Sequence, residues 1–401
     1  MVKNKKLQEI DLSLNSLVVF RKLMTHEVIL PLRGLLDTET MDPVIQLRLY
    51  TEFVSRLYTQ SMNLTEYIFR LICEDENFYI KAKARGEEVD PLLDACVENE
   101  LAILERLARL KPHELQKEVS YYGVLPEWKT AEINFFESYM ERVRNIEKYG
   151  YGLFARHAMF VLREGACVPV QHPDPVSLSE LCGYDAERQR ILDNTLSLLN
   201  GRPAQNILLY GDTGTGKSAT VKAIVNTYFG EGLRLIQVTR EQIPEIPQLM
   251  QTLSGNPLKF IIFLDDLCPD SFGSGISELK AALEGSVSQK CSNTVIYATS
   301  NYRGLLREHA GEVFGSEKQQ HDAEQERAGL AGRFGIRVHF EMPAKQQYLA
   351  TAGFLAEQRG LSIAQPVLEQ AAWDYAQQIG ECSPRAAGQI VSRLLAEELA
   401  K

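Results

Sequence analysis

A glycine-rich run that ends in Lys217 and Ser218 has the residue types and spacing of a phosphate-binding loop. Residues 211–218 (GDTGTGKS) match the pattern GxxxxGK[ST] at every specified position. The run follows an apolar strand predicted at Ile207–Tyr210 and precedes a helix predicted at Ser218–Tyr228. Glycines let successive backbone N–H groups converge on a phosphate, and the positive end of a helix favours its charge. The pattern therefore predicts a site for a nucleoside triphosphate.

The lysine and the hydroxyl that close this loop have separate expected roles. Lys217 can reach the β- and γ-phosphates, and the Ser218 hydroxyl can ligate Mg²⁺. The predicted nucleotide-binding residues of the loop are Gly211, Asp212, Thr213, Gly214, Thr215, Gly216, Lys217, Ser218 and Ala219.

Two adjacent carboxylates follow a second apolar strand. Asp265 and Asp266 come directly after Phe260–Leu264, and Asp265 lies 265 − 217 = 48 residues beyond Lys217. A phosphate-binding loop needs an acid at the end of a neighbouring strand to hold the hydrated metal. We therefore expect Asp265 to bind Mg²⁺ and Asp266 to orient or deprotonate the attacking water. The alternative is an acidic turn with no chemical role.

A third buried strand, predicted at Thr294–Thr299, ends in the polar residues Ser300 and Asn301. A side-chain amide there would lie near the γ-phosphate and could position the lytic water. We expect this role for Asn301, although a Ser-Asn pair taken alone is an ordinary turn.

Strands that alternate with helices predict the fold around these residues. Short β-rich runs separated by helical stretches are typical of a parallel sheet with helices on both faces. The runs are Ile207–Tyr210, Leu233–Val238, Phe260–Leu264, Thr294–Thr299 and Ile336–Phe340. Three further helices are predicted past Pro343, at Lys345–Arg359, Pro366–Ile379 and Pro384–Leu399. They have the size of a small helical lid.

The first part of the chain has a helical pattern instead. Apolar residues recur at steps of three and four before a proline-rich stretch, Val168–Leu178, that favours an extended linker. We therefore expect three domains: a mostly helical one at 1–175, an α/β nucleotide-binding one at 176–342 and a lid at 343–401.

Composition sets limits on the class of protein. The 401 residues carry 43 basic and 53 acidic side chains, a net charge of −10, and 45% are hydrophobic. This excludes a wholly disordered chain and argues against coating nucleic acid through bulk charge. No apolar run is long enough for a membrane span, and charged residues interrupt any signal-peptide core at the N-terminus. Seven scattered cysteines without a CxxC pair are typical of free thiols, so we expect a cytoplasmic protein without a zinc site.

In order and context, these motifs resemble those of the AAA+ ATPase superfamily over about residues 176–401. Residues 211–218 resemble Walker A, 260–266 Walker B, and Asn301 the sensor-1 residue. The resemblance implies that Arg333 in the run LAGRFG is an arginine finger and that Arg385 in SPR is the sensor-2 arginine. Residues 181–185 (LCGYD) resemble the stretch before the P-loop that contacts the adenine, which implies this role for Gly183 and Tyr184. A closer resemblance is to a little-characterised bacterial AAA+ family, ATP-binding proteins of unknown function with a helical N-terminal region.

Physical chemistry adds its own argument for Arg385. The arginine follows Ser383 and Pro384, a good N-cap and first-turn pair for a helix. A cation in the first turn opposes the helix dipole at a cost of about 0.3–1 kcal/mol. A bound γ-phosphate nearby would offset that cost.

The resemblance implies an overall architecture and an activity. The fold would be a P-loop AAA+ core, with a parallel five-stranded sheet flanked by helices, a C-terminal helical lid and a mostly α-helical N-terminal domain. The function would be Mg²⁺·ATP hydrolysis coupled to remodelling or loading of a macromolecular partner through the N-terminal domain. The subunits would form a ring or filament, with a hexamer as one form. The alternative is a nucleotide-gated binding or scaffold switch with little turnover, and nucleic acid stays open as a ligand.

Two departures from the AAA+ pattern bear on the activity. Asp266 stands where many members of the superfamily have glutamate, so turnover is expected to be slow. The aromatic–hydrophobic–glycine triplet of threading pores is missing from residues 239–259. The similar run Tyr228-Phe-Gly230 lies before the second strand and is expected to be a helix end with a glycine C-cap. The missing triplet argues against a pore that threads polypeptides.

Overall fold

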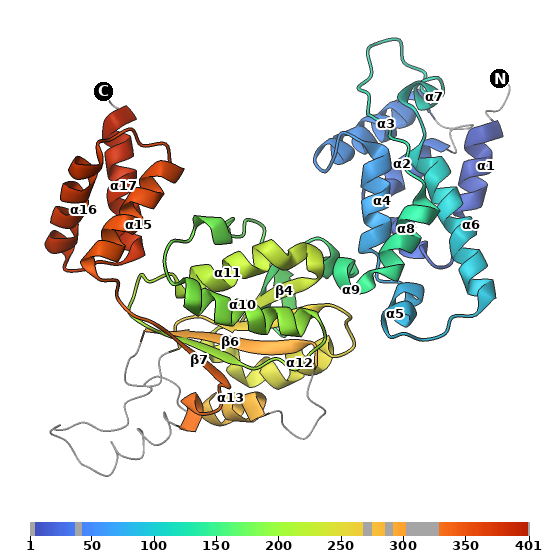
Figure 1. Cartoon of the computed structure of the whole chain (residues 1–401). Helices are drawn as coiled ribbons and strands as arrows, with labels where there is room; N and C mark the ends of the chain where they lie inside the picture. Colours follow the sequence, from blue (N-terminus) through green and yellow to red (C-terminus); the bar gives the residue numbers. More distant parts are fainter. Residues whose placement is uncertain (1–4, 37–41, 268–274, 285–291, 302–328, 400–401) are drawn as a thin grey trace. The chain divides into compact units, whose positions relative to one another are not determined.

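The structure is a computed structural model that describes residues 5–36, 42–267, 275–284, 292–301 and 329–399 (Figure 1). The chain divides into two compact units, Met1–Arg156 and His157–Lys401. The N-terminal unit has one hydrophobic core, and the C-terminal unit has separate cores around its sheet and among its last helices.

The N-terminal unit is helical, as predicted. Its α-helices are α1 (Lys5–Leu14), α2 (Ile29–Leu36), α3 (Pro43–Tyr58), α4 (Leu64–Glu74), α5 (Phe78–Ala84), α6 (Pro91–Ala108), α7 (Pro112–Gln116), α8 (Phe135–Arg144) and α9 (Ile146–Tyr149), with 3₁₀ turns η1 (Arg21–Thr25) and η2 (Gly152–Ala155). Proline begins three of these helices because the first helical N–H has no partner within the helix. Asp90 caps α6 by accepting a hydrogen bond of 2.8 Å from the N–H of Leu92.

A buried carboxylate ties the start of this unit to its longest helix. Glu100 on α6 is 1% exposed. Its oxygens accept hydrogen bonds of 2.7–3.1 Å from the backbone N–H groups of Val18, Val19 and Phe20. These bonds satisfy donors that no helix or strand pairs, so one side chain holds the turn between α1 and η1 in place.

The C-terminal unit contains a seven-stranded sheet in the order β2-β1-β4-β5-β6-β3-β7. The strands are β1 (Met159–Arg163), β2 (Ala166–Pro169), β3 (Ile207–Gly211), β4 (Leu233–Gln237), β5 (Lys259–Leu264), β6 (Thr294–Ser300) and β7 (Ile336–Phe340). The five strands β3–β7 are parallel to their neighbours and agree with the predicted runs. The predicted fold class, an α/β core with a helical lid and a mostly helical N-terminal region, is confirmed.

The sheet is larger than predicted by one hairpin. Strand β1 pairs with β4 in parallel, and β2 pairs with β1 antiparallel. The turn between them is Glu164-Gly165, both with positive φ (49° and 76°). The prediction puts these residues in the helical domain and starts an extended linker at Val168, which lies in β2 instead. The two compact units divide after Arg156, and the domain boundary at 175 stays a prediction. The hairpin is short, and its turn lacks the Asn-Gly or Asp-Gly signal that marks such hairpins.

Helices cover both faces of the sheet, as predicted. Figure 1 shows α10 (Asp185–Leu199) and α11 (Lys217–Tyr228) on one face, and α12 (Ile246–Leu253) and α13 (Gly275–Glu284) on the other. The expected glycine C-cap of α11 at Gly230 is wrong. A 3₁₀ turn, η4 (Phe229–Glu231), continues the helix, and Gly232 takes the left-handed conformation at φ 96°.

The last three helices match the predicted lid within one residue at each end. They are α15 (Lys345–Gln358), α16 (Gln365–Ile379) and α17 (Pro384–Leu399), packed around a core rich in alanine. A separate lid domain beginning at 343 stays a prediction, because sheet and lid fall within one compact unit. Among the described residues, no helix is both long and apolar enough to cross a bilayer.

Candidate nucleotide-binding site

The phosphate-binding loop joins β3 to α11 and depends on its glycines. Gly211, Gly214 and Gly216 have φ values of 128°, 79° and 90°, which side chains other than glycine rarely adopt. A Cβ atom on Gly211 would lie 2.1 Å from the carbonyl oxygen of Phe340 on β7. The glycine at the start of the loop is therefore required by close approach of the next strand as well as by backbone conformation.

Lys217 is buried at the start of α11, with 5% of its surface exposed. Its ammonium donates hydrogen bonds to the carbonyl oxygens of Gly211 (3.0 Å) and Asp212 (2.6 Å). Burial lowers the pKa of Lys217 to about 8, although the neighbouring Asp212 carboxylate acts in the opposite direction. An anion bound at the loop would favour the charged form and raise this pKa again.

Oxygen atoms suited to Mg²⁺ meet beside the loop. The Ser218 hydroxyl donates a 2.5 Å hydrogen bond to Oδ1 of Asp265, and the Thr299 hydroxyl donates one of 2.7 Å to the same oxygen. Among the described residues no three His, Cys, Asp or Glu side chains gather as a metal site. Mg²⁺ is usually held by one or two protein oxygens together with substrate phosphates and water, so the Ser218 and Asp265 oxygens are suitable protein ligands for it.

Asp266 is held in an unusual backbone conformation with φ 58°. Its N–H donates a 2.9 Å hydrogen bond to the Thr299 hydroxyl, and its carboxylate accepts one of 2.9 Å from the Asn301 amide. The carboxyl ends of β5 and β6 thus bring Asp265, Asp266 and Asn301 together. Strained backbone of this kind concentrates at functional sites. Thr299, which the sequence analysis gave no role, links both acids.

A cavity of about 810 Å³ joins these groups to the lid. The predicted site residues that line it are Gly214, Thr215, Gly216, Lys217, Ser218, Ala219, Asp265, Asp266, Asn301 and Arg385. Ligand cavities in proteins are typically about 300–1,000 Å³, so the space is of nucleotide size.

The lid rests directly on the phosphate-binding loop. The backbone N–H of Arg385 donates to the carbonyl oxygen of Gly214 at 3.2 Å. A Cβ atom on Gly214 would lie 2.6 Å from side-chain oxygens of both Glu381 and Ser383. Ser383 caps α17 by accepting a 3.2 Å hydrogen bond from Ala386 N–H, as its sequence position predicts. A ligand at the loop therefore contacts the part of the lid that carries Arg385.

Two cavity-lining arginines have no sequence motif to mark them. Arg188 donates hydrogen bonds to the Leu181 carbonyl oxygen (3.1 Å) and to Asp185 (3.0 Å). Arg359 reaches the Gly388 carbonyl oxygen (2.8 Å) from the end of α15. Sequence patterns do not reveal Arg188 or Arg359 as site residues, because their helix ends reach the phosphate-binding loop only in the folded chain.

Other predicted site residues lie outside the cavity wall. Gly211, Asp212 and Thr213 are not among its lining residues, and Asp212 instead accepts a 2.8 Å hydrogen bond from Met342 N–H. Their predicted roles are not tested by this arrangement.

The segment expected at the adenine lies partly in the cavity wall, and the predicted arginine finger lies outside it. Leu181 and Cys182 line the cavity together with Glu180, whereas the Tyr184 hydroxyl donates to the Glu341 carbonyl oxygen at 2.6 Å. Gly183, which precedes Tyr184, does not line the cavity either. Arg333 donates a 2.8 Å hydrogen bond to the Gly329 carbonyl oxygen and does not line the cavity of its own chain.

No curated protein matches this chain. Three solved structures of RuvB variants from Thermotoga maritima are 16–17% identical and cover 55–56% of this chain with TM-scores of 0.38–0.39. The match spans 64–65% of those chains, less than two thirds of their length. Nothing about activity follows from a likeness at this level.

The family comparison is more extensive. A model for the family described as "Protein of unknown function (DUF815)" matches residues 155–398. The match begins at the boundary between the two units, so it spans the hairpin, the sheet and the lid. It also confirms the prediction of a little-characterised family without an assigned function. Since it covers more than half of the sequence, the chain belongs to the DUF815 family.

Proposed function

We propose that this protein binds ATP with Mg²⁺ and hydrolyses the bond between the β- and γ-phosphates. One observation carries the proposal. A single cavity of nucleotide size contains the phosphate-binding loop, the Ser218–Asp265 pair and the Asp266–Asn301 pair. These are the groups that phosphoryl transfer needs, namely a cradle for phosphates, oxygens for the metal and a carboxylate for the water.

The loop and the metal-binding oxygens would hold the substrate. Lys217 supplies a positive charge next to the Gly211 and Asp212 carbonyl oxygens. Ser218 and Asp265 would hold Mg²⁺, which supplies charge neutralisation at the phosphates. The Thr299 hydroxyl keeps the Asp265 carboxylate oriented through its 2.7 Å hydrogen bond.

Asp266 would accept the proton of the attacking water. The left-handed backbone and the bond from its N–H to Thr299 fix where this carboxylate points. The Asn301 amide donates to the carboxylate, which keeps one of its oxygens oriented. A base placed in this way typically contributes about 10²–10⁴ in rate.

The lid would sense the nucleotide. Arg385 lines the cavity, and its backbone N–H bonds to Gly214. A phosphate bound at the loop would therefore change the position of the lid. We further propose that the protein works in the cytoplasm as a homo-oligomer, a ring or filament such as a hexamer, in which Arg333 acts on the site of the neighbouring subunit. The N-terminal unit would pass lid motion to a macromolecular client, and nucleic acid stays open as a ligand.

One observation favours a second candidate, a nucleotide-gated switch with little turnover. The Asp266 carboxylate is already bonded to Asn301, and its side chain is one methylene shorter than the glutamate of many AAA+ proteins. A carboxylate engaged in this way is a weaker acceptor for a water proton.

Phosphate release measured with Mg²⁺·ATP separates the two candidates. The proposed enzyme turns over with Mg²⁺, stops when the metal is chelated, and loses about 100-fold or more of its rate in Asp266→Asn while still binding ATP. Asparagine suits this position because it tolerates positive φ better than most residues. Binding of ATP without phosphate release, with and without candidate partners, would support the switch instead.

A further inference from the structure

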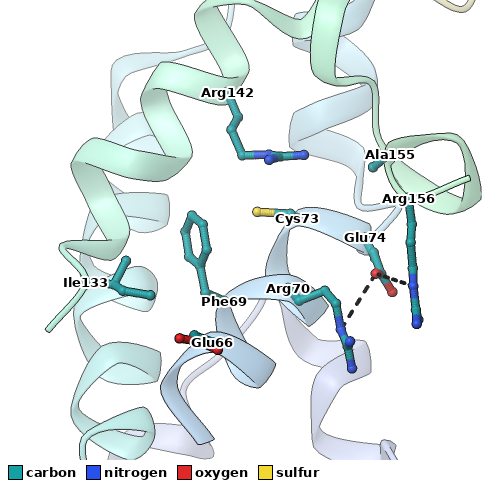
Figure 2. Close-up of a pocket in the computed structure, with 9 residues that line it drawn as sticks. All are labelled: Glu66, Phe69, Arg70, Cys73, Glu74, Ile133, Arg142, Ala155 and Arg156. Carbon is teal, nitrogen blue, oxygen red and sulfur yellow. Dashed lines mark ion pairs between the residues drawn. The ribbon is translucent and has the colours of Figure 1, made fainter. Parts of the chain in front are cut away.

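The N-terminal unit contains a small pocket of about 270 Å³ between α4, α8 and the turn η2 (Figure 2). Its apolar wall includes Phe69 and Ile133, while three arginines and two glutamates supply its charges. Figure 2 shows the arginines arriving from different directions around Cys73 and Glu74. The pocket is separate from the cavity of about 810 Å³ beside the phosphate-binding loop (the nucleotide cavity), whose lining residues all belong to the other unit.

The three guanidinium groups come from three separate elements. Arg70 lies on α4, Arg142 on α8, and Arg156 directly follows η2. Arg70 and Arg156 approach Oε1 of Glu74 at 3.9 and 4.0 Å, distances too long for hydrogen bonds. Arg142 stacks on the ring of Tyr149 at 4.5 Å, and no described carboxylate lies within ion-pair distance of it. The fold thus gathers positive charge here without pairing it closely.

Two buried polar atoms of the pocket lack any hydrogen-bond partner in the described part of the chain. They are Nε of Arg70 and Oε1 of Glu74. Buried donors in proteins are almost always bonded, so the unpaired Nε of Arg70 is free to donate to an anionic oxygen in the pocket. Burial raises the pKa of Glu74, which favours the protonated carboxyl beside such an anion. Burial raises the pKa of the Cys73 thiol to about 12, so this lining residue stays neutral and adds no charge to the pocket.

Charge and shape together define the chemistry of a partner. With both glutamates ionised, Arg70, Arg142 and Arg156 against Glu66 and Glu74 leave a net charge of 3 − 2 = +1 among the lining residues. One monoanion balances this charge, whereas a phosphate dianion would exceed it beside two carboxylates. A planar carboxylate also matches the donor fork of a guanidinium. The Phe69 and Ile133 side chains can cover a short apolar body attached to the anion.

We propose that this pocket binds a carboxylate carried on a small apolar group. Two sources share this chemistry, a free organic acid and the C-terminal residue of a peptide with an apolar side chain. The inference does not depend on ATP hydrolysis, because the pocket belongs to the other unit. It gives the N-terminal unit a specific ligand-binding activity of its own.

Ligand-observed NMR titration of the full chain tests the proposal with a matched pair of probes. The probes are 4-methylpentanoate and its neutral amide, in excess Mg²⁺·ADP to keep the acid away from the phosphate-binding loop. The carboxylate should bind saturably and the amide about tenfold more weakly or not at all, because the amide lacks the charge. Saturable binding of neither probe, or equal binding of both, would overturn the proposal.

Variants locate the binding. Arg142→Gln and Arg156→Gln should each weaken carboxylate binding by about tenfold, and Arg142→Lys should weaken it less, because lysine keeps the charge but loses the planar donor fork. Arg144→Gln is the matched control, since Arg144 lies on the same helix but is exposed and outside the pocket. Equal affinity in all four variants would place the binding elsewhere and contradict the assignment. Stronger binding of inorganic phosphate than of the carboxylate would also contradict it.

Two further probes separate the sources. A tripeptide, N-acetyl-Gly-Gly-Leu, is compared with its C-terminal amide on the same variants. Binding of the free-acid peptide that is lost in Arg142→Gln supports the proposal with a peptide source. Binding of 4-methylpentanoate alone supports it with a free acid, because the pocket is then too small for a chain.

Discussion

The two cavities of this protein hold similar side chains in opposite arrangements. In the nucleotide cavity, each acid is bonded to a neighbour: Asp265 to Ser218 and Thr299, and Asp266 to Asn301. In the N-terminal pocket, Arg70 and Glu74 stand too far apart for a hydrogen bond, and each leaves a buried atom unpaired. The first arrangement fixes its acids by hydrogen bonds, as the proposed reaction requires, while the second has unpaired atoms that a ligand or water would bond.

The contrast predicts how each region responds to substitution. A residue of the nucleotide site acts within a bonded network, so its loss should affect chemistry more than the fold. Two carboxylates of the N-terminal unit differ in their hydrogen bonds. Glu100 accepts bonds from the backbone and supports the fold, whereas Glu74 has a buried oxygen without a hydrogen-bond partner in the described part of the chain.

Arg333→Ala should keep ATP binding and lose turnover. Arginine fingers are worth about 10³–10⁵ in rate in GTPases, because they neutralise charge in the transition state. Arg333 does not line its own cavity, so the effect should arise between subunits. Mixing Arg333→Ala with Asp266→Asn should partly restore phosphate release once co-assembly is shown by co-purification. Co-assembled mixtures as inactive as either variant would remove Arg333 from the neighbour's site.

Glu100→Ala should destabilise the N-terminal unit by about 3 kcal/mol or more. The substitution strands the buried N–H groups of Val19 and Phe20, which then have no acceptor, and unpaired buried donors cost about 1–3 kcal/mol each. Urea unfolding followed by circular dichroism measures the loss. Glu98→Ala, an exposed change on the same helix, is the control. Equal midpoints for the two variants would show that the Glu100 bonds contribute nothing to stability.

ATP affinity should fall as pH rises above 8. In the free protein the pKa of Lys217 is about 8, against an ordinary value of 10.5, because burial disfavours its charge. Bound phosphate favours the ammonium, so binding at pH 8 should take up about half a proton. Calorimetry in two buffers of different ionisation enthalpy measures the uptake. Proton release, or none, would contradict this view of the lysine.

The same pKa shift predicts how the stability of the ligand-free protein changes with pH. Between pH 8 and 10.5 the unfolded chain holds more protons at Lys217 than the folded chain, so this group raises stability as pH increases. The unfolding midpoint of the natural protein should rise relative to that of Lys217→Met across this window. A flat or falling relative midpoint would mean that the lysine stays charged in the folded protein.

Arg385→Ala should change the stability of the fold least. The variant should gain stability without nucleotide and lose affinity for ATP. Without nucleotide the variant should gain about 0.3–1 kcal/mol, because a cation is removed from the first turn of α17. With ATP it should lose affinity, since Arg385 lines the cavity. Thermal unfolding with and without Mg²⁺·ATP checks both signs. A variant that loses stability without nucleotide would show that Arg385 supports the lid structurally.

The difference between the cavities also explains what sequence could predict. Local sequence patterns predict the phosphate-binding loop, the two acids and the strands β3–β7, because each of these features is formed by residues adjacent in the chain. The β1–β2 hairpin was missed because its strands are short and its Glu-Gly turn is atypical. Arg359 enters the nucleotide cavity only through lid packing, and the N-terminal pocket joins Arg70 to Arg156 across helices. No periodicity or motif records such contacts between distant segments.

The cavity beside Lys217 is proposed to bind Mg²⁺·ATP. Isothermal titration of Mg²⁺·ATP into the natural protein and into Lys217→Ala measures this binding. Lys222→Ala, a change of the same kind on α11 outside the cavity, is the control. We expect saturable binding in the natural protein and the control, and none in Lys217→Ala, because the charge facing the phosphates is gone. Unchanged ATP affinity in Lys217→Ala, or no binding by the natural protein, would contradict the account.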